Sequence, residues 1–152
     1  MEITTYLDIA VHVIFSLIAG FIAWKFYGQR ELKRLKLSIF FSFLTGVAID
    51  FDHFLDNFIV FGLSFNYHKF VIGDYFHKTS KAYILFHGFE YIVILALIFI
   101  LVKSGKTKMI LLSMILGMFF HLATDIILFT HSIKEYSLFY RILHNFKLDK
   151  PL

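Results

Sequence analysis

Four long apolar runs alternate with short polar links along the chain. The runs cover residues 3–26, 37–56, 82–102 and 109–130. As α-helices they are long enough, or nearly so, to cross the roughly 30 Å hydrocarbon core of a membrane. The pattern therefore predicts an all-α fold: an integral membrane bundle of four transmembrane helices, with residues 1–152 as a single membrane domain.

Two further segments are apolar but do not fit a membrane-spanning helix. Residues 58–76 are interrupted by Gly62, Asn66 and Gly73, and we expect a lid or a re-entrant piece there. Residues 133–147 have the pattern of an amphipathic helix, which would lie on the membrane surface or pack against the bundle. Its apolar side would carry Tyr136, Phe139, Tyr140, Leu143 and Phe146, and its polar side Lys134, Ser137, Arg141 and Asn145.

The composition agrees with a membrane protein. Hydrophobic residues make up 59% of the chain and charged residues 17%, whereas soluble domains have about 45–50% and about 25%. A soluble domain of 152 residues cannot bury so large an apolar fraction. With one proline and no cysteine, the chain is also neither collagen-like nor a disulfide scaffold.

The basic residues predict an orientation. They cluster in the link between the first two runs and in the link between the last two, which places both links in the cytoplasm. Both termini and the link 57–81 then lie outside, and we expect a location in the cytoplasmic membrane of a bacterium or an archaeon. Because the net charge of +4 arises from these clusters, we expect membrane lipid as a partner and no nucleic acid.

Each of the four runs carries a carboxylate and a histidine three or four positions apart. The pairs are Asp8 with His12, Asp50 with His53, His87 with Glu90, and His121 with Asp125. Residues at this spacing share one face of a helix. Counted from the basic residue at the cytoplasmic end of each run, all eight lie 13 to 17 residues away, which is about 20–25 Å along a helix. The four pairs should therefore meet in one layer in the outer half of the membrane.

Carboxylates at this depth need compensation. Each costs about 2.5–3.5 kcal/mol at the centre of a span, and lysines and arginines stand at the ends of the runs rather than beside them. Oxygen and imidazole ligands without thiolates suit zinc, manganese or iron. We therefore predict one or two divalent metal ions, with zinc as the first choice. The predicted ligands are His12, Asp50, His53, His87, His121 and Asp125.

Other polar residues receive different roles. Asp52 or Glu90 would bridge the metal or act as the general base, and Asp8 would orient His12. We interpret Asp56 as an ordinary helix-terminal acid. A lone histidine in an apolar run is more often a hydrogen-bonded core residue than a ligand. We interpret His68, His131 and His144 either as core residues of this kind or as residues exposed to solvent.

Three pairs of small residues favour close helix contacts. They are Ser16 with Gly20, Ser42 with Gly46, and Ser113 with Gly117, each four positions apart. Such pairs allow helices to approach closely in lipid. Gly46 and Gly117 each precede a predicted ligand by one turn, so close packing is expected directly beside the metal site.

The polar motifs resemble those of the YdjM-like family of inner-membrane metal-dependent hydrolases. The matching residues are His12, Asp50-Phe51-Asp52-His53, His77 with Phe86-His87-Gly88, and His121 with Asp125, within residues 8–130. The chain departs from the family in having Ile49 where a proline is common, His77 and His87 ten positions apart, and Gly88 in place of serine. The resemblance implies a membrane-embedded metal hydrolase and assigns no substrate.

Three functions are compatible with this pattern. The first is hydrolysis of an ester or phosphoester bond, in a lipid or lipid-linked substrate. The second is transport of metal ions or protons, although transporter sites usually lie near the membrane midplane between internal repeats, and no repeat is visible in the sequence. The third is a structural membrane subunit with a bound metal. The oligomeric state is left open.

Overall fold

The computed structural model describes residues 2–71, 73–129 and 132–147, without the side chains of residues 2–6, 71, 75, 77 and 129. Within these ranges every regular element is a helix, as the all-α prediction requires, and the one isolated β-bridge joins Lys81 to Lys147. The elements are α1 (Glu2–Tyr27), α2 (Leu32–Gly46), η1 (Ala48–Phe51), α3 (Asp52–Phe61), α4 (Tyr67–Val71), α5 (Asp74–Thr79), α6 (Phe89–Leu101), α7 (Gly105–Phe129), η2 (Ile133–Tyr136) and α8 (Leu138–Leu143).

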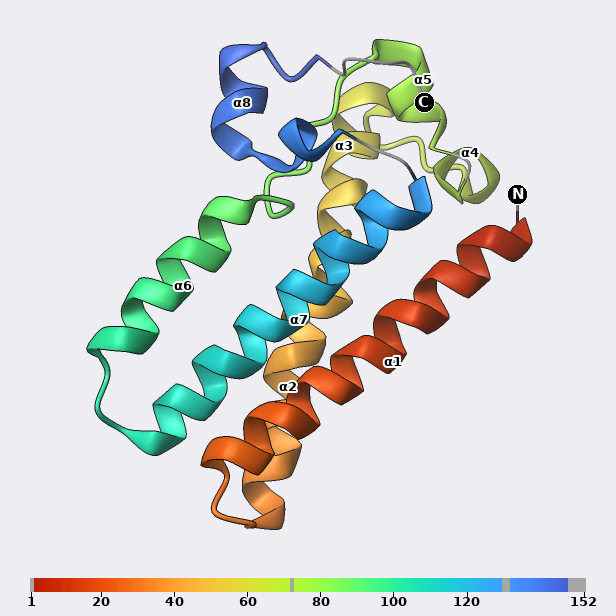
Figure 1. The fold of residues 1–152 in the computed structure, drawn as a ribbon. Coiled ribbons are helices and arrows are strands. Elements are labelled where there is room, and N and C mark those ends of the chain that lie inside the picture. The colour runs from red at the N-terminus through yellow and green to blue at the C-terminus, as the bar shows by residue number, and fades with distance from the viewer. Residues whose placement is uncertain (1, 72, 130–131, 148–152) are drawn as a thin grey trace.

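The long helices form an elongated bundle, and the short helices gather at one of its ends (Figure 1). Helices α1, α2 and α7 pack on one another, and α6 packs on α7. Helices α3, α4, α5 and α8 lie at the same end of the bundle as the N-terminus. Residues 58–76, expected to form a lid or a re-entrant piece, contribute the end of α3, all of α4 and the first part of α5.

Two of the four predicted spans are present as uninterrupted long helices. Within the described residues, Leu7–Tyr27 of α1 and Gly105–Leu128 of α7 are long and apolar enough to cross a membrane. The second run divides at Val47, where the backbone leaves helical geometry (φ −136°, ψ −51°). The third run becomes helical only at Phe89, so α6 is shorter than predicted. Among the described residues, the structure therefore shows two of the four predicted full-length helices.

The late start of α6 has a physical cause in polar contacts between distant segments. Asp52 and Asp56, which follow the first break, accept hydrogen bonds from the backbone amides of Phe86 and Tyr83 at 2.8 and 2.9 Å. Those amides precede the start of α6. Side chains thus replace helical hydrogen bonds for two amides of residues 82–88, which allows this backbone to adopt an irregular path before α6.

Small residues join α1, α2 and α7 closely, as the paired spacing predicts. The Ser42 hydroxyl on α2 donates to the Ser16 carbonyl on α1 at 2.6 Å. One turn earlier on the same face of α2, the Ser38 hydroxyl lies 2.7 Å from that of Ser113 on α7. A Cβ atom added to Gly117 would lie 2.5 Å from the Ser42 carbonyl oxygen. The backbones therefore approach too closely for any larger residue.

Replacement of Gly117 by alanine should destabilise the bundle. The added methyl group must push α7 away from α2, and overpacking of this kind costs about 1–3 kcal/mol. The melting temperature in detergent should fall. Gly105→Ala is the matched control, since a Cβ atom there meets no other atom within 4 Å and alanine favours a helix. Equal melting temperatures for the two variants would contradict the packing argument.

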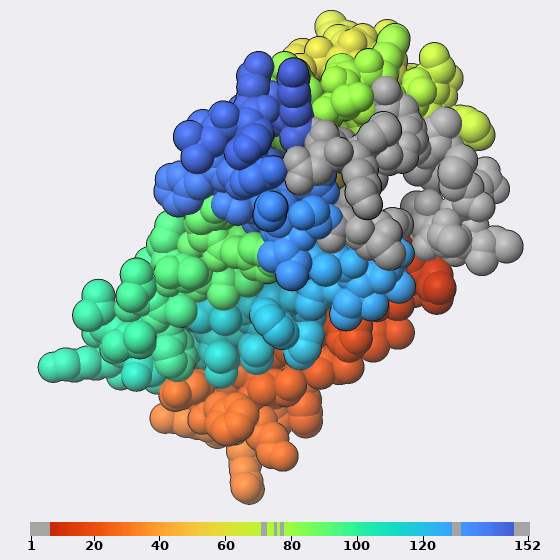
Figure 2. Space-filling view, turned by 45° about the horizontal axis from the view of Figure 1, so that its top comes forward, coloured from red at the N-terminus to blue at the C-terminus, as the bar shows by residue number. Residues whose placement is uncertain are grey.

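The C-terminal segment differs from the single amphipathic helix predicted over 133–147. It forms η2 and α8, and Figure 2 shows it in blue directly against the green segment that precedes and begins α6. Phe139 and Leu143, from the predicted apolar side, are 69% and 81% exposed. Arg141, from the predicted polar side, is only 1% exposed. The assignment of Arg141 to an exposed polar face is therefore wrong.

Candidate metal centre

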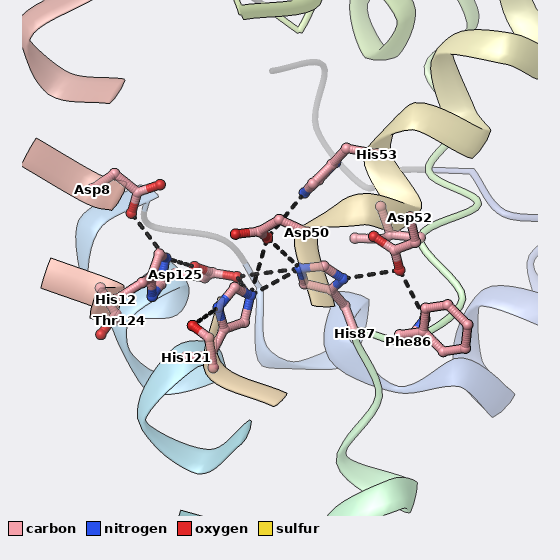
Figure 3. Close-up of polar contacts among 12 residues, drawn as sticks. Asp8, His12, Asp50, Asp52, His53, Phe86, His87, His121, Thr124 and Asp125 are labelled. Atoms are coloured by element: carbon pink, nitrogen blue, oxygen red, sulfur yellow. Dashed lines mark hydrogen bonds and ion pairs between the residues drawn. The ribbon is translucent and has the colours of Figure 1, made fainter. Parts of the chain in front are cut away.

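The structure brings the six predicted ligands together from four parts of the chain (Figure 3). Helix α1 supplies His12, the region of η1 and α3 supplies Asp50 and His53, the segment before α6 supplies His87, and α7 supplies His121 and Asp125. Their donor atoms fall into two groups of the size that holds a metal ion. One group is His12, His121 and Asp125, and the other is Asp50, His53 and His87.

Two imidazoles and two carboxylates meet at the centre of the cluster. The Nε2 atoms of His87 and His121 lie 2.9 Å apart. Asp50 Oδ1 lies 3.2 Å from the first and 3.3 Å from the second. Asp125 Oδ2 lies 3.9 and 3.4 Å from the same two atoms. Ligands bound tetrahedrally at about 2.0–2.1 Å from zinc would lie about 3.3 Å from one another, so these groups could hold a metal ion as well as form ion pairs.

The outer nitrogen of each central imidazole is held by an acceptor. His87 Nδ1 lies 3.1 Å from Asp52 Oδ2, and His121 Nδ1 lies 3.2 Å from the Gly46 carbonyl oxygen. Since a carboxylate and a carbonyl only accept, both Nδ1 atoms must donate. In a neutral imidazole the Nε2 atom then carries a lone pair. Two lone pairs at 2.9 Å repel each other, so this contact requires either a proton on one of the two Nε2 atoms or a metal ion bound by both.

His12 sits on the far side of Asp125. Its Nε2 atom lies 3.0 Å from Asp8 Oδ1 and 3.2 Å from Asp125 Oδ1. Its ring stacks on that of His121, with centroids 4.2 Å apart. The side chain is buried, and within the described part of the chain its Nδ1 atom has no hydrogen-bond partner. Asp8 therefore contacts His12, as expected for the residue predicted to orient it.

His53 and Asp50 form the open side of the cluster. His53 Nε2 lies 3.7 Å from Asp50 Oδ1, and the His53 ring lies 5.1 Å from that of His87. The side chains of His53 and Asp50 are 24% and 38% exposed, whereas those of His87 and His121 are almost completely buried. A molecule from outside would therefore meet the cluster at Asp50 and His53.

Asp52, predicted as a bridging ligand or base, lies behind His87. One oxygen, Oδ2, contacts His87 Nδ1 and accepts the Phe86 amide. Asp52 is buried, and among the described residues its other oxygen has no hydrogen-bond partner. The contacts give Asp52 the role of orienting the His87 ring, as carboxylates commonly do for metal-binding histidines.

Glu90, the alternative base, does not join the cluster. Its carboxylate accepts hydrogen bonds from the Ser137 hydroxyl at 2.5 Å and from the backbone amides of Leu138 and Phe139 at 3.0 and 3.2 Å. These amides begin α8 and have no partner within that helix, so a carboxylate is stabilised there. His87 precedes α6, so the two residues do not share a helix face. The expectation that Glu90 shares the metal site is therefore corrected.

Arg141 is a residue of the site that the sequence analysis missed. Its guanidinium donates to the carbonyl oxygens of Ile84 and His87, the latter at 2.8 Å. Burial lowers the pKa of Arg141, while the carboxylates of Asp52, Glu90 and Asp56 act in the opposite direction. Arginine remains protonated in proteins, so a buried cation lies beside these acids. The signal in the sequence was a single charge within the apolar stretch Leu138–Leu143.

The remaining histidines lie apart from the described cluster or outside the described residues. His68 and His144 are exposed, and His144 Nδ1 lies 2.8 Å from the Tyr140 carbonyl oxygen. The side chain of His77 and all of His131 lie outside the part of the chain that the structure describes. Asp56, expected to be an ordinary helix-terminal acid, instead holds the Tyr83 amide.

Comparison with family models, with curated proteins and with solved structures finds no match for this chain. The family resemblance therefore stays a prediction. The geometry of the His/Asp cluster is what supports a function.

Proposed function

We propose that the protein is a membrane-embedded, metal-dependent hydrolase. The observation that carries the proposal is the pair of Nε2 atoms of His87 and His121, 2.9 Å apart and both directed at Asp50 and Asp125. With both Nδ1 atoms donating elsewhere, this arrangement requires a positive charge at the two Nε2 atoms. A proton or a bound metal ion supplies such a charge, and we take it to be a metal ion. Divalent zinc fits the nitrogen and oxygen donors best, and manganese and iron are the alternatives.

The cluster suits hydrolysis because it combines buried ligands with an open side. A divalent ion held by these residues supplies Lewis acidity toward the substrate oxygen and lowers the pKa of water toward about 7. His12, His87 and His121 are buried and hold their positions. His53, on the open side, is placed to accept a proton from the attacking water, in place of the base role first assigned to Asp52 or Glu90.

The surroundings favour a lipid or lipid-linked ester or phosphoester as substrate. Phe51, Phe54 and Phe58, which flank His53 on η1 and α3, are 70%, 45% and 52% exposed. Large exposed apolar side chains beside a polar site are typical of contact with lipid. With the basic links in the cytoplasm, both termini and the cluster lie toward the outer face of the membrane.

Transport of ions fits the structure less well. A transporter must open its site to both sides, whereas the helices pack closely on the α2 side of the cluster. A Cβ atom on Gly46 would collide with the Ser16 hydroxyl, and the Ser42 hydroxyl bridges α2 to α1. Such close packing leaves no room for a path between α1 and α2.

The hydrolase proposal is tested with purified protein in detergent. Phospholipids and lipid-linked phosphates are screened for release of a soluble head group after removal of metal and after addition of zinc or manganese. We expect turnover only with metal, and a loss of at least about 10²-fold in His53→Ala if His53 is the base. His68→Ala, at an exposed histidine, is the matched control. A protein that binds metal, cleaves nothing, and moves zinc or manganese across liposomes would overturn the proposal.

A further inference from the structure

The two oxygens of Asp125 face different sets of groups. Oδ1 lies 3.2 Å from His12 Nε2. Oδ2 lies 3.4 Å from His121 Nε2 and 3.9 Å from His87 Nε2. A carboxylate that presents one oxygen to each of two sets of ligand atoms has the geometry of a bridge between two metal ions. We infer that the centre holds two divalent ions, with Asp125 as the bridging ligand and Asp8 as a ligand of the second ion.

The second position is built from His12, Asp8 and Asp125. His12 Nε2 lies 3.0 Å from Asp8 Oδ1 and 3.2 Å from Asp125 Oδ1, which are spacings expected around one small cation. Asp8 Oδ1 is buried, and its contact with His12 Nε2 at 3.0 Å has the length of an ion pair. One imidazole proton cannot satisfy two carboxylates, whereas a divalent ion can bind all three atoms.

The first ion position lies apart from the second. Its atoms are the Nε2 atoms of His87 and His121 with Asp50 Oδ1 and Asp125 Oδ2, and His53 borders it on the open side. The two positions share Asp125 and the stacked rings of His12 and His121. Asp8, which the sequence predicted to orient His12, is therefore assigned here as a direct ligand of the second ion.

The charges of the cluster also favour two ions. Asp8, Asp50 and Asp125 carry three negative charges with neutral histidines, and Asp52 and Asp56 have Arg141 beside them. One divalent ion would leave an uncompensated negative charge at a largely buried site, which is costly. With Asp52 and Asp56 included, the five carboxylates and Arg141 carry a charge of −4, which two divalent ions balance. Paired ions are also the usual device for displacement at phosphorus.

Two ions narrow the substrate class, a step that rests on the proposed function. Because paired divalent ions suit displacement at phosphorus, they favour a phosphoester over a carboxylic ester. The substrate we assign is therefore a phosphoester of a lipid or a lipid-linked molecule, with its phosphoryl oxygens directed at the two positions. Hydrolysis breaks one phosphorus–oxygen bond and forms another with water, the leaving oxygen takes a proton, and no oxidant or reductant is required.

The number of ions is the direct test. Metal-free protein is loaded with manganese, passed through a desalting column, and measured for metal content per chain and for magnetic coupling by electron paramagnetic resonance. We expect two ions and a coupled spectrum in the wild-type protein and in His68→Ala. His12→Ala and Asp8→Asn should each retain one ion, with the spectrum of isolated manganese. Because Asp8→Asn keeps the size of the side chain, it still tests the second position if His12→Ala fails to fold.

The outcomes separate this inference from the proposed function. One ion per wild-type chain, with phosphoester cleavage intact, would overturn the two-ion centre and leave the hydrolase standing. Two coupled ions without cleavage of any phosphoester would leave the two-ion centre standing and overturn the hydrolase. Wild-type metal content in both His12→Ala and Asp8→Asn would remove these residues from the second position.

Discussion

His121→Ala should lose metal binding and activity together. His121 contacts both groups of ligand atoms, since its Nε2 atom lies 2.9 Å from His87 Nε2 and its ring stacks on His12. Zinc bound by about four protein ligands contributes about 10–16 kcal/mol. The loss of one ligand should therefore weaken binding by about 10²–10³-fold. Metal analysis after desalting and competition with a chelator of known affinity measure this directly.

The same variant should also remove the effect of metal on stability. A ligand that binds only the folded state raises the melting temperature by mass action. A chelator should therefore lower the melting temperature of the wild-type protein and have a much smaller effect on that of His121→Ala. The matched control is Leu122→Ala. This variant removes a buried apolar neighbour, which costs about 2–5 kcal/mol in packing, and leaves every candidate ligand in place. Wild-type affinity for zinc in His121→Ala would contradict the assignment.

Arg141→Met should be the most damaging change outside the ligands. The guanidinium holds the carbonyl oxygens of Ile84 and His87 and is almost completely buried. Removal of one partner from a buried charged network costs about 3–5 kcal/mol, because the remaining charges lose their compensation. It also frees the backbone of His87. Loss of a group that positions a ligand typically lowers metal affinity about 10–100-fold.

Two variants separate charge from geometry. Arg141→Lys keeps the charge but replaces the planar guanidinium by a single ammonium. Its melting temperature and zinc affinity should therefore lie between those of the wild type and Arg141→Met. Arg34→Met is the control, since Arg34 pairs with the half-exposed Glu31 and such pairs contribute at most about 1 kcal/mol. Thermal unfolding in detergent and zinc competition measure both effects. Unchanged zinc affinity in a folded Arg141→Met protein would restrict Arg141 to a purely structural role.

The parts of the fold that follow from local pattern could be predicted. The long apolar runs predict α1 and α7, and the small residues at Gly46 and Gly117 predict the close contacts with α2. The i,i+4 spacing of His121 and Asp125 places both on one side of α7 whatever the rest of the chain does. The similar depth of the histidine and carboxylate pairs along the four apolar runs was enough to predict that residues on separate segments would meet.

The parts that depend on tertiary hydrogen bonds could not be predicted. Residues 82–88 read as the start of a helix, but Asp52, Asp56 and Arg141 bind their backbone and hold them in an irregular path. The sequence contains no local signal for such partners. Glu90 was assigned to the metal site by its spacing from His87, a rule that holds only when both residues lie on the same helix.

The contacts of the C-terminal segment impose an order on the assembly of the protein. Arg141 and Phe146 anchor the segment that carries His87, through the carbonyl oxygens held by Arg141 and the hydrogen bond from the Ala82 amide to the Phe146 carbonyl oxygen at 2.9 Å. Chains fold as they emerge from the ribosome, N-terminal parts first. The helices that carry His12, Asp50 and His121 are therefore made before the clamp on His87 exists. All six candidate ligands are synthesised before Arg141 and Phe146, so the step that completes last is the fixing of the backbone that carries His87.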